Sequence, residues 1–415
     1  MSNVLQVRDL HVGFRTLGGI INAVNGISLD IRRGKTLALV GESGSGKSVT
    51  AQAILGILPR SASITGGQIL FSPPGGQEVD LAQIEPASKA YGAIRGDQIS
   101  IIFQEPMTSF SPLHTIGDQI SEALYLHRDI GKAAGRAASI EMLRLVGFPE
   151  PAKAFDTYPF ELSGGLRQRG MIAMALVCRP ALLIADEPTT ALDVTVQAQV
   201  LGVIKDLQAE LNMAVLLITH DLGVVANVAD DVVVAYRGRV MEAGSLEDIF
   251  ERPQHPYLKA LLNAVPHFDM KPGERLVPIR EIKLPREQLQ ILGGGDAAGD
   301  RNVASGPVLE VRNIFKSFAI RKQTKLLSGE PDASAVALNG VSLDVEQGEC
   351  LGLVGESGCG KTTLSKVIMR AVEADSGQVI FSGGEAPVDL LSLDARQMEP
   401  LRRKIQYVFQ DPFSS

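Results

Sequence analysis

Four short runs of apolar residues in the first part of the chain each end at a polar or glycine-rich segment. The runs cover residues 36–40, 98–103, 181–185 and 214–219. Their Leu, Ile and Val residues are nearly continuous, which is typical of strands buried on both faces of a parallel sheet. We therefore predict an α/β fold in which helices flank a parallel sheet.

Helical periodicity replaces this pattern in residues 115–145, which predicts a separate helical lobe. A further helix is expected over residues 167–178, just before the third apolar run. The four apolar runs lead into Gly41, Gln104, Asp186 and His220. Ligands of α/β folds bind at the carboxyl ends of parallel strands. We therefore expect these four positions to lie close together at one edge of the sheet.

The pattern Gly-x-x-x-x-Gly-Lys, followed by Ser or Thr, occurs twice and predicts two phosphate-binding loops. The first phosphate loop consists of Gly41, Glu42, Ser43, Gly44, Ser45, Gly46, Lys47 and Ser48. The second phosphate loop consists of Gly355, Glu356, Ser357, Gly358, Cys359, Gly360, Lys361 and Thr362. The alternative for each is a plain glycine-rich turn between a strand and a helix, but two matches inside similar flanking sequences exclude coincidence.

The residue types of these loops suit a nucleoside triphosphate. Glycines let successive backbone N–H groups converge on phosphate oxygens, and the following helix N-terminus adds its dipole. Lys47 and Lys361 can reach the β- and γ-phosphates, while the hydroxyls of Ser48 and Thr362 can bind Mg²⁺. The expected cofactors are therefore ATP and Mg²⁺.

The flanks of the two loops make the chain an imperfect tandem repeat. Val-Leu-Gln-Val-Arg-Asp-Leu at residues 4–10 returns as Val-Leu-Glu-Val-Arg-Asn-Ile at residues 308–314. Later segments return in the same order. We divide the chain into a first unit, a tail, a linker rich in Pro, Gly and charge, and a second unit. These span residues 4–250, 251–266, 267–307 and 308–415.

Composition narrows the class of protein. A length of 415 residues predicts two or more domains, and 45% apolar residues with 5% aromatics favour a soluble α/β protein. The net charge of −7 argues against nucleic-acid binding. No run of 18 apolar residues is present, so we expect a cytosolic protein whose membrane role, if it has one, depends on a partner. The three cysteines and six histidines form no cluster, which predicts no zinc site.

The order of further motifs resembles the ATP-binding cassette (ABC) ATPases. Leu-Ser-Gly-Gly at residues 162–165 resembles the signature motif of that family, Asp186-Glu187 its Walker B pair and Ala-Leu-Asp at residues 191–193 its D-loop. His220 resembles the switch histidine. The resemblance implies a P-loop NTPase cassette with a parallel sheet core, an antiparallel β subdomain and a helical subdomain, followed by an incomplete second copy.

The same resemblance implies a role for each matching residue. Asp186 would hold the Mg²⁺ shell with Ser48, Gln104 would contact the ion or the attacking water, and Glu187 would polarise that water. His220 would donate to the γ-phosphate. Ser163, Gly164 and Gly165 would cap the nucleotide held by the opposite cassette. Individually, Asp186 could be a turn residue, His220 a strand-end cap and Gln104 a surface amide.

Adenine stacking is expected from an aromatic residue upstream of each loop. Phe14 is the candidate in the first unit, although a core position is the alternative. Phe318 is its counterpart in the second unit, with Phe315 as a rival.

The tail points to one branch of that family. Residues 251–266, together with residues 104–120 and 158–165, resemble ATPases of oligopeptide, dipeptide or glutathione importers with two fused cassettes. This implies a peripheral protein at the cytoplasmic face of the inner membrane. Its partners would be integral-membrane permease subunits and, indirectly, an extracytoplasmic solute-binding protein. Residues 267–307, directly after the tail, contain no cysteine, so no iron–sulfur cluster is expected.

The second unit contains a phosphate loop and Gln410, a further expected Mg²⁺ ligand, but no second signature, Walker B pair or switch histidine. We therefore expect this chain to be a fragment of an importer ATPase, with its second cassette truncated. A homodimer formed through two first units could still hydrolyse ATP. The alternatives are an ATP-binding remnant without turnover and a soluble twin-cassette protein.

Overall fold

The computed structural model describes residues 2–104, 109–189, 192–265, 306–319, 334–383 and 386–409. Two compact units divide the chain, Met1–Lys283 and Leu284–Ser415. Gln410 and almost all of the predicted linker lie outside the described residues. No helix of the described residues is both long enough and apolar enough to cross a membrane.

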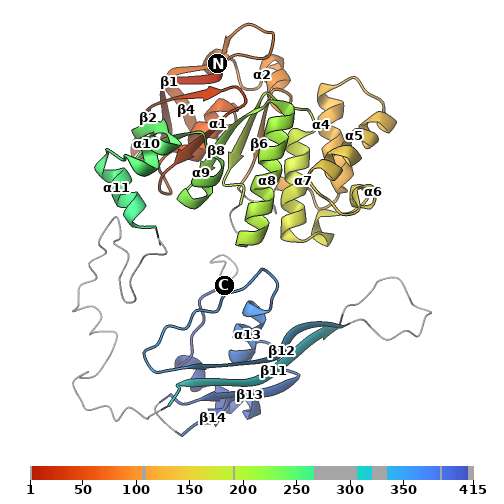
Figure 1. Ribbon diagram of the computed structural model, residues 1–415, viewed down its shortest axis with the longest axis vertical. Helices are drawn as coiled ribbons and strands as arrows, with labels where there is room; N and C mark the ends of the chain where they lie inside the picture. The colour runs from red at the N-terminus through yellow and green to blue at the C-terminus, as the bar shows by residue number, and fades with distance from the viewer. Residues whose placement is uncertain are drawn as a thin grey trace. The chain divides into compact units, whose positions relative to one another are not determined.

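The central sheet of the first unit has the strand order β10-β9-β3-β8-β7-β6. Figure 1 labels β8 and β6 of this sheet. Its strands are β3 (Thr36–Val40), β6 (Ile99–Ile102), β7 (Leu182–Asp186), β8 (Ala214–Thr219), β9 (Asp231–Tyr236) and β10 (Arg239–Ser245). All pairs are parallel except the β9–β10 hairpin at one edge. The four predicted strands are present, and every residue of β3, β7 and β8 is buried, whereas β6 is the edge strand and its Ile101 is half-buried.

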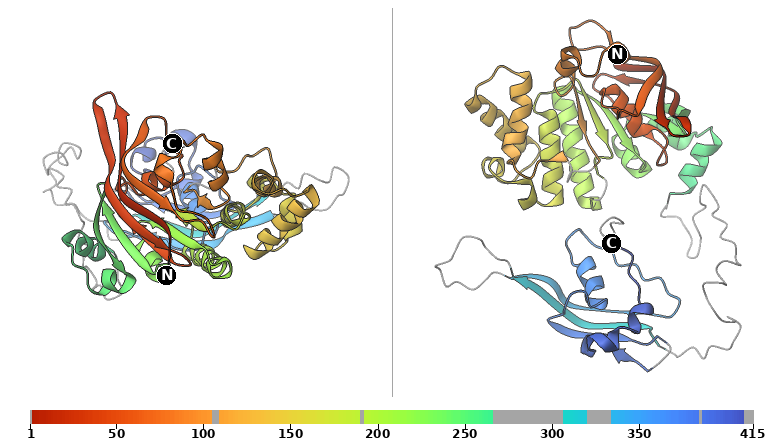
Figure 2. Two further views of the ribbon diagram at one scale, coloured as in Figure 1. Left: turned by 90° about the horizontal axis from the view of Figure 1, so that it is seen from above. Right: turned by 180° about the vertical axis from the view of Figure 1, so that it is seen from behind.

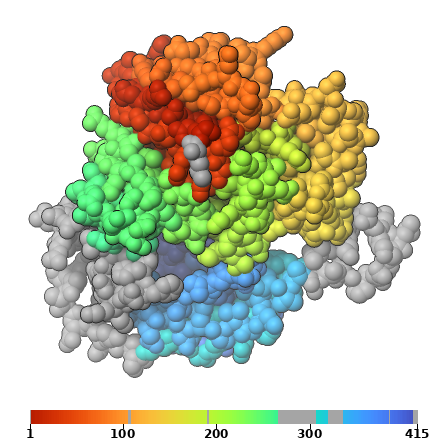
Figure 3. All heavy atoms as spheres, turned by 45° about the horizontal axis from the view of Figure 1, so that its top comes forward, coloured from red at the N-terminus to blue at the C-terminus, as the bar shows by residue number. Residues whose placement is uncertain are grey.

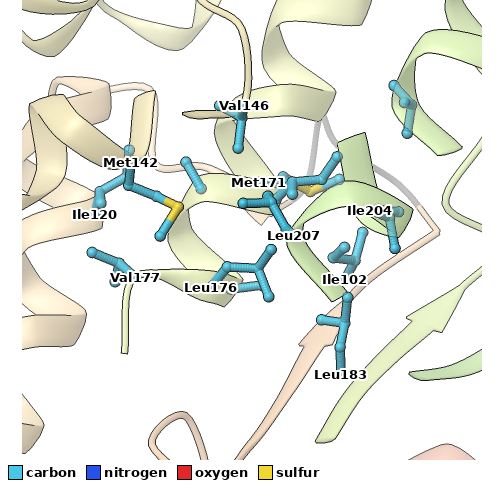
Figure 4. Close-up of a cluster of buried hydrophobic side chains, with 14 of the residues drawn as sticks. Ile102, Ile120, Met142, Val146, Met171, Leu176, Val177, Leu183, Ile204 and Leu207 are labelled. Carbon is cyan, nitrogen blue, oxygen red and sulfur yellow. The ribbon is translucent and has the colours of Figure 1, made fainter. Parts of the chain in front are cut away.

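Helices cover the two faces of this sheet. They include α1 (Lys47–Ile54), α7 (Gly164–Leu176), α8 (Val194–Leu211), α9 (Leu222–Val228), α10 (Leu246–Glu251) and α11 (Pro256–Asn263). Because strand side chains alternate between faces, Ile184 of β7 packs on the side of α1, whereas Leu183 packs on the side of α7 and α8. Figure 4 shows Leu183 and Ile102 close to Ile204 of α8 within this second cluster.

An antiparallel sheet of order β2-β1-β4-β5 forms a second layer of the first unit. It comprises β1 (Asn3–Thr16), β2 (Gly19–Arg32), β4 (Ala62–Phe71) and β5 (Val79–Asp80), followed by the short 3₁₀ helix η1 (Leu81–Gln83) and helix α2 (Lys89–Ile94). This sheet (red to orange) and the helical lobe lie on opposite sides of the first unit (Figure 2). It shares the hydrophobic cluster of α1, so it holds that helix against the central sheet.

The helical lobe consists of α4 (Ile116–His127), α5 (Lys132–Leu145), α6 (Pro151–Phe155) and the 3₁₀ helix η2 (Pro159–Glu161). The space-filling view shows the lobe (yellow) on the surface of the first unit (Figure 3). The apolar core of the lobe is continuous with the cluster beneath the central sheet. The helix expected over residues 167–178 starts earlier, at Gly164, because the Ser163 hydroxyl caps it by accepting the Leu166 N–H at 3.4 Å.

The second unit repeats the antiparallel layer. Strands β11 (Leu309–Ala319), β12 (Ser334–Val345), β13 (Ser376–Phe381) and β14 (Val388–Asp389) are ordered β12-β11-β13-β14. Helix α13 (Lys361–Ile368) corresponds to α1, and η3 (Leu390–Ser392), α14 (Ala395–Met398) and η4 (Leu401–Arg403) follow β14. These elements share a small core that contains Ile314 and Leu364.

The second unit differs from the first just before its phosphate loop. Residues 351–354 occupy the position of β3 in the repeat but form no strand. Val354 is 89% exposed, whereas its counterpart Val40 is 0% exposed. Strand β3 is buried because β8 and β9 pair with it on both sides, and no described strand of the second unit takes those places.

Two glycine substitutions test the packing of the first unit. A Cβ at Gly117 in α4 would meet ring carbons of Phe155 at 2.2 to 2.4 Å, so Gly117→Ala should lower the free energy of unfolding by about 1–3 kcal/mol. Gly202 in α8 is exposed and a Cβ there meets nothing within 4 Å. Gly202→Ala should therefore raise that free energy by about 0.5–1 kcal/mol. Urea unfolding followed by circular dichroism measures the free energy of unfolding of both variants. The same change in the two variants would contradict the packing described for α4.

Candidate functional site

The first phosphate loop connects β3 to α1 and is pressed against neighbouring backbone. A Cβ at Gly41 would lie 2.1 Å from the Ala235 carbonyl oxygen, and one at Gly46 would lie 2.6 Å from the Ala23 carbonyl oxygen. Gly46 also adopts a φ of 92°, which favours glycine, as the N-cap of α1. Both positions therefore require glycine, because the backbone of β9 lies close to Gly41 and that of β2 lies close to Gly46. The loop is held between these two strands.

Lys47 lies within this loop rather than pointing away from it. Its Nζ donates to the carbonyl oxygens of Gly41 at 2.8 Å and Glu42 at 2.9 Å, and the residue is 6% exposed. Burial lowers the pKa of Lys47, an effect opposed by the nearby carboxylates of Glu187, Asp186 and Glu42. A buried ammonium at the N-terminus of α1 is suited to a phosphate anion.

Ser48 and Asp186 place two oxygen ligands next to Lys47. The Ser48 hydroxyl donates to Asp186 Oδ1 at 3.1 Å. Asp186 ends β7 and is 7% exposed, and burial is the main cause that raises the pKa of its carboxyl. Mg²⁺ prefers one or two carboxylates together with water and phosphate oxygens. The described residues contain no group of three or more His, Cys, Asp or Glu residues that could hold a metal ion.

Glu187 joins Gln104 and His220 in one hydrogen-bonded group. Its Oε2 accepts from Gln104 Nε2 at 2.9 Å, and its Oε1 lies 3.1 Å from His220 Nδ1. These residues follow β6, β7 and β8, so the predicted convergence of strand ends is observed. Glu187 adopts a φ of 49°, a strained value for a non-glycine residue, while its N–H donates to the Ile218 carbonyl at 2.8 Å. Backbone strain of this kind is concentrated at functional sites.

The predicted signature residues lie at the start of α7, on the surface. Ser163 and Gly164 are exposed, and a Cβ at Gly164 would meet nothing within 4 Å. Gly165 packs on the other side, where a Cβ would lie 2.9 Å from Val196 Cγ1 at the start of α8. The N-terminus of α7 is thus fixed to α8 while its open face is available to another molecule.

Phe14 is placed apart from the catalytic candidates, in strand β1. It is half-buried and pairs with Ile21 of β2 and Ala62 of β4. Since β2 also supplies the Ala23 carbonyl beside Gly46, Phe14 lies on strands that flank the phosphate loop. Its role in stacking on adenine stays a prediction.

Gln168 was not among the residues identified from the sequence. It is 2% exposed in α7, and its amide donates to the carbonyl of Pro188, the residue after Glu187. The helix that begins at the signature residues is therefore joined directly to the segment that carries Glu187. The detectable signal was a polar residue on the face of α7 that also buries Ile172 and Ala175.

The second phosphate loop repeats the local geometry of the first. Lys361 Nζ donates to the carbonyls of Gly355 at 2.7 Å and Glu356 at 2.6 Å, and a Cβ at Gly360 would lie 2.4 Å from the Ala337 carbonyl oxygen. Lys361 is only half-buried, and Thr362 is exposed. Gln410 lies outside the described residues, so its predicted contact with Mg²⁺ stays a prediction.

Comparison with known families decides the classification. The model of the ABC transporter family matches residues 24–190 and 338–415, more than half of the chain. The chain belongs to the ABC transporter family. A second model, the C-terminal region of oligopeptide/dipeptide transporters, matches residues 241–294 and includes the tail predicted at residues 251–266.

Relatives of this ABC protein align with its whole length. It is 44% identical over 414 residues to the glutathione import ATP-binding protein GsiA of Salmonella typhimurium (strain LT2). It is 43% identical over 418 residues to the protein of the same name in Escherichia coli (strain K12). Each match covers 100% of this chain and 65% of the relative, so the chain spans about two thirds of the length of these proteins.

Solved structures confirm the ABC cassette fold. The dimeric cassette MJ0796 bound to ADP and Pi aligns with a TM-score of 0.52 at 24% identity, covering 58% of this chain and 98% of that one. The structure of cbiO1 from Clostridium perfringens aligns with a TM-score of 0.51 at 27% identity, covering 61% of this chain and 92% of that one. The predicted combination of parallel core, antiparallel layer and helical lobe is therefore correct.

Two alanine variants separate backbone conformation from crowding in the first phosphate loop. Gly44 and Gly46 have φ values of 78° and 92°, so either substitution should cost about 1–2 kcal/mol for the left-handed conformation. A Cβ at Gly44 meets nothing within 4 Å, whereas one at Gly46 meets Ala23. Gly46→Ala should therefore lose about 1–3 kcal/mol more stability than Gly44→Ala, as measured by chemical unfolding without nucleotide. Indistinguishable losses would contradict the close approach of β2 to the loop.

Proposed function

We propose that this chain binds and hydrolyses ATP as the subunit that energises a membrane permease for the import of glutathione, peptides or related small solutes. The observation that supports this most strongly is the group of Glu187, Gln104 and His220 beside Lys47 and its phosphate loop. The names of the relatives, glutathione import ATP-binding proteins, support the class of solute.

In this proposal the first phosphate loop holds the triphosphate of ATP. Loop N–H groups and Lys47 bind the phosphate oxygens once Lys47 exchanges the carbonyls of Gly41 and Glu42 for the anion. Ser48, Asp186 and Gln104 would hold Mg²⁺, which neutralises charge on the phosphates when bound.

Glu187 is the proposed general base of hydrolysis. Its carboxylate side chain is 14% exposed and is hydrogen-bonded on one oxygen by Gln104 and paired on the other with His220. Two partners on opposite oxygens fix the plane of the carboxylate, so that a water can be oriented in line with the terminal phosphate. The exposed ring of His220, at 61%, can turn toward the phosphate once nucleotide arrives.

The signature residues are proposed to act on a nucleotide bound by a second cassette. Ser163 and Gly164 are exposed at the N-terminus of the 13-residue helix α7, where backbone N–H groups and the helix dipole favour an anion. A homodimer through two first cassettes would complete two such sites. In the second phosphate loop, Lys361 and Thr362 are proposed to bind a nucleotide phosphate and its cation.

The membrane partner is proposed to be a pair of permease subunits at the cytoplasmic face of the inner membrane, served by an extracytoplasmic solute-binding protein. Phe103, which lines the groove beside the phosphate loop together with Gln104, supports a docking site for a cytoplasmic permease helix. Ser48 and Asp186 line the same groove and are assigned to the nucleotide and its cation. Phe103 is 44% exposed there, so a partner seated on it would lie directly next to Gln104.

Substitution of Lys47 and Glu187 separates binding from turnover. Lys47→Ala should weaken ATP binding by about tenfold to a hundredfold, because charged hydrogen bonds to phosphate are lost. Glu187→Gln should bind ATP as tightly as the wild type but hydrolyse it at least about a hundredfold more slowly. Equilibrium binding of a fluorescent ATP analogue and phosphate release measure the two effects.

Glu141→Gln is the matched control, because Glu141 pairs with Arg144 on the exposed surface of α5. It should leave binding and hydrolysis unchanged. Binding by the wild type without any turnover would support the ATP-binding remnant instead, and a wild type that does not bind ATP would refute the proposal.

Membrane association tests the proposed partner. In cells that contain the permease subunits, the tagged chain should sediment with membranes, and deletion of those subunits should move it to the supernatant. Phe103→Asp should reduce this association, because it places a charge on the exposed aromatic surface of the groove. Sedimentation with ribosomes instead would favour the soluble twin-cassette alternative.

A further inference from the structure

The tail helix α11 is packed against the strand that leads into the first phosphate loop. Tyr257 is 9% exposed and Leu258 is 0% exposed, and both belong to a cluster with Val40 and Val234. Val40 is the last residue of β3 and immediately precedes the loop. The Tyr257 ring also lies 4.5 Å from the ring of Tyr236 at the end of β9. Helix α11 is thus part of the wall behind the loop.

One polar contact connects α11 to the loop itself. The N–H of Glu42, the second residue of the loop, donates to the Tyr257 hydroxyl oxygen at 3.4 Å. The carbonyl of the same residue accepts from Lys47 Nζ at 2.9 Å. Glu42 is therefore held on its N–H side by the tail and on its carbonyl side by the phosphate-binding lysine.

The start of α11 is itself anchored to the central sheet. The Glu242 carboxylate on β10 accepts from the N–H of Gln254 at 3.0 Å and of His255 at 2.8 Å. His255 Nδ1 in turn accepts from the N–H of Tyr257 at 3.1 Å and caps the helix. Carboxylate bonds to backbone N–H groups are strong, so Tyr257 is presented from a fixed position.

We propose that Tyr257 is a positioning residue for ATP binding, which holds the Glu42 peptide so that the loop and Lys47 keep the geometry that accepts phosphate. This inference rests on the proposed function, because it assumes that the first phosphate loop binds ATP. The tail then contributes to the nucleotide site from outside the phosphate loop, and a merely structural α11 would affect stability without affecting the loop.

Tyr257→Phe in the full chain tests this, because it removes the hydroxyl and keeps the ring against Tyr236. The affinity for a fluorescent ATP analogue should fall by about twofold to fivefold, the range expected for one long neutral hydrogen bond. Amide exchange of the peptide that contains Glu42 should become faster without nucleotide. Tyr125→Phe is the matched control, because its hydroxyl donates to the Lys132 carbonyl at 3.3 Å in the helical lobe. It should change neither quantity.

Glu242→Gln provides an independent second variant, since it weakens the anchor of α11 without altering Tyr257. It should change exchange at Glu42 and ATP affinity in the same direction. Unchanged exchange and affinity in Tyr257→Phe, or a lower melting temperature with neither change, would overturn the inference. If the wild-type chain fails to bind ATP, the proposed function fails, while the exchange measurement still decides whether Tyr257 holds the loop.

Discussion

Parallel pairing of the central strands is the constraint on which the candidate site depends. In register, Val40 of β3 pairs with Thr219 of β8, and Asp186 of β7 pairs with Ile218. The strands therefore end almost level with one another, and the residues that follow them are brought to one edge. Groups that are far apart in the chain meet there without any long side chain having to reach across the sheet.

Forming this site without a ligand lowers the stability of the chain. Burial lowers the pKa of Lys47 and raises that of Asp186, so each charged form is disfavoured by its surroundings. Hydrogen bonds from Lys47 to loop carbonyls and from Ser48 to Asp186 offset part of this cost. Glu187 adds a left-handed backbone conformation. Such a combination is common at sites where a bound ligand stabilises the buried charges. The polyphosphate and cation of the proposed function would do so here.

Comparison of the two units shows which features of the phosphate loop depend on local sequence and which depend on distant strands. Both phosphate loops bring a lysine to the first two loop carbonyls and place a left-handed glycine before the helix. This geometry therefore arises from the loop and the antiparallel layer alone. Burial differs, because Val40 is covered by β8, β9 and the tail helix, whereas Val354 is exposed. The depth of Lys47 in its unit is set by strands that come much later in the chain.

Local pattern in the sequence determined the buried strands, the phosphate loops and the order of the polar residues, because apolar runs and glycine spacing act over a few residues. It also located the tail as a distinct element. Only the tertiary structure decided that Gln168 reaches Pro188, that Tyr257 reaches Glu42, and that Glu187 is bonded on both oxygens. These contacts join segments separated by tens to hundreds of residues, and their geometry follows from strand order and helix packing, which no short pattern encodes.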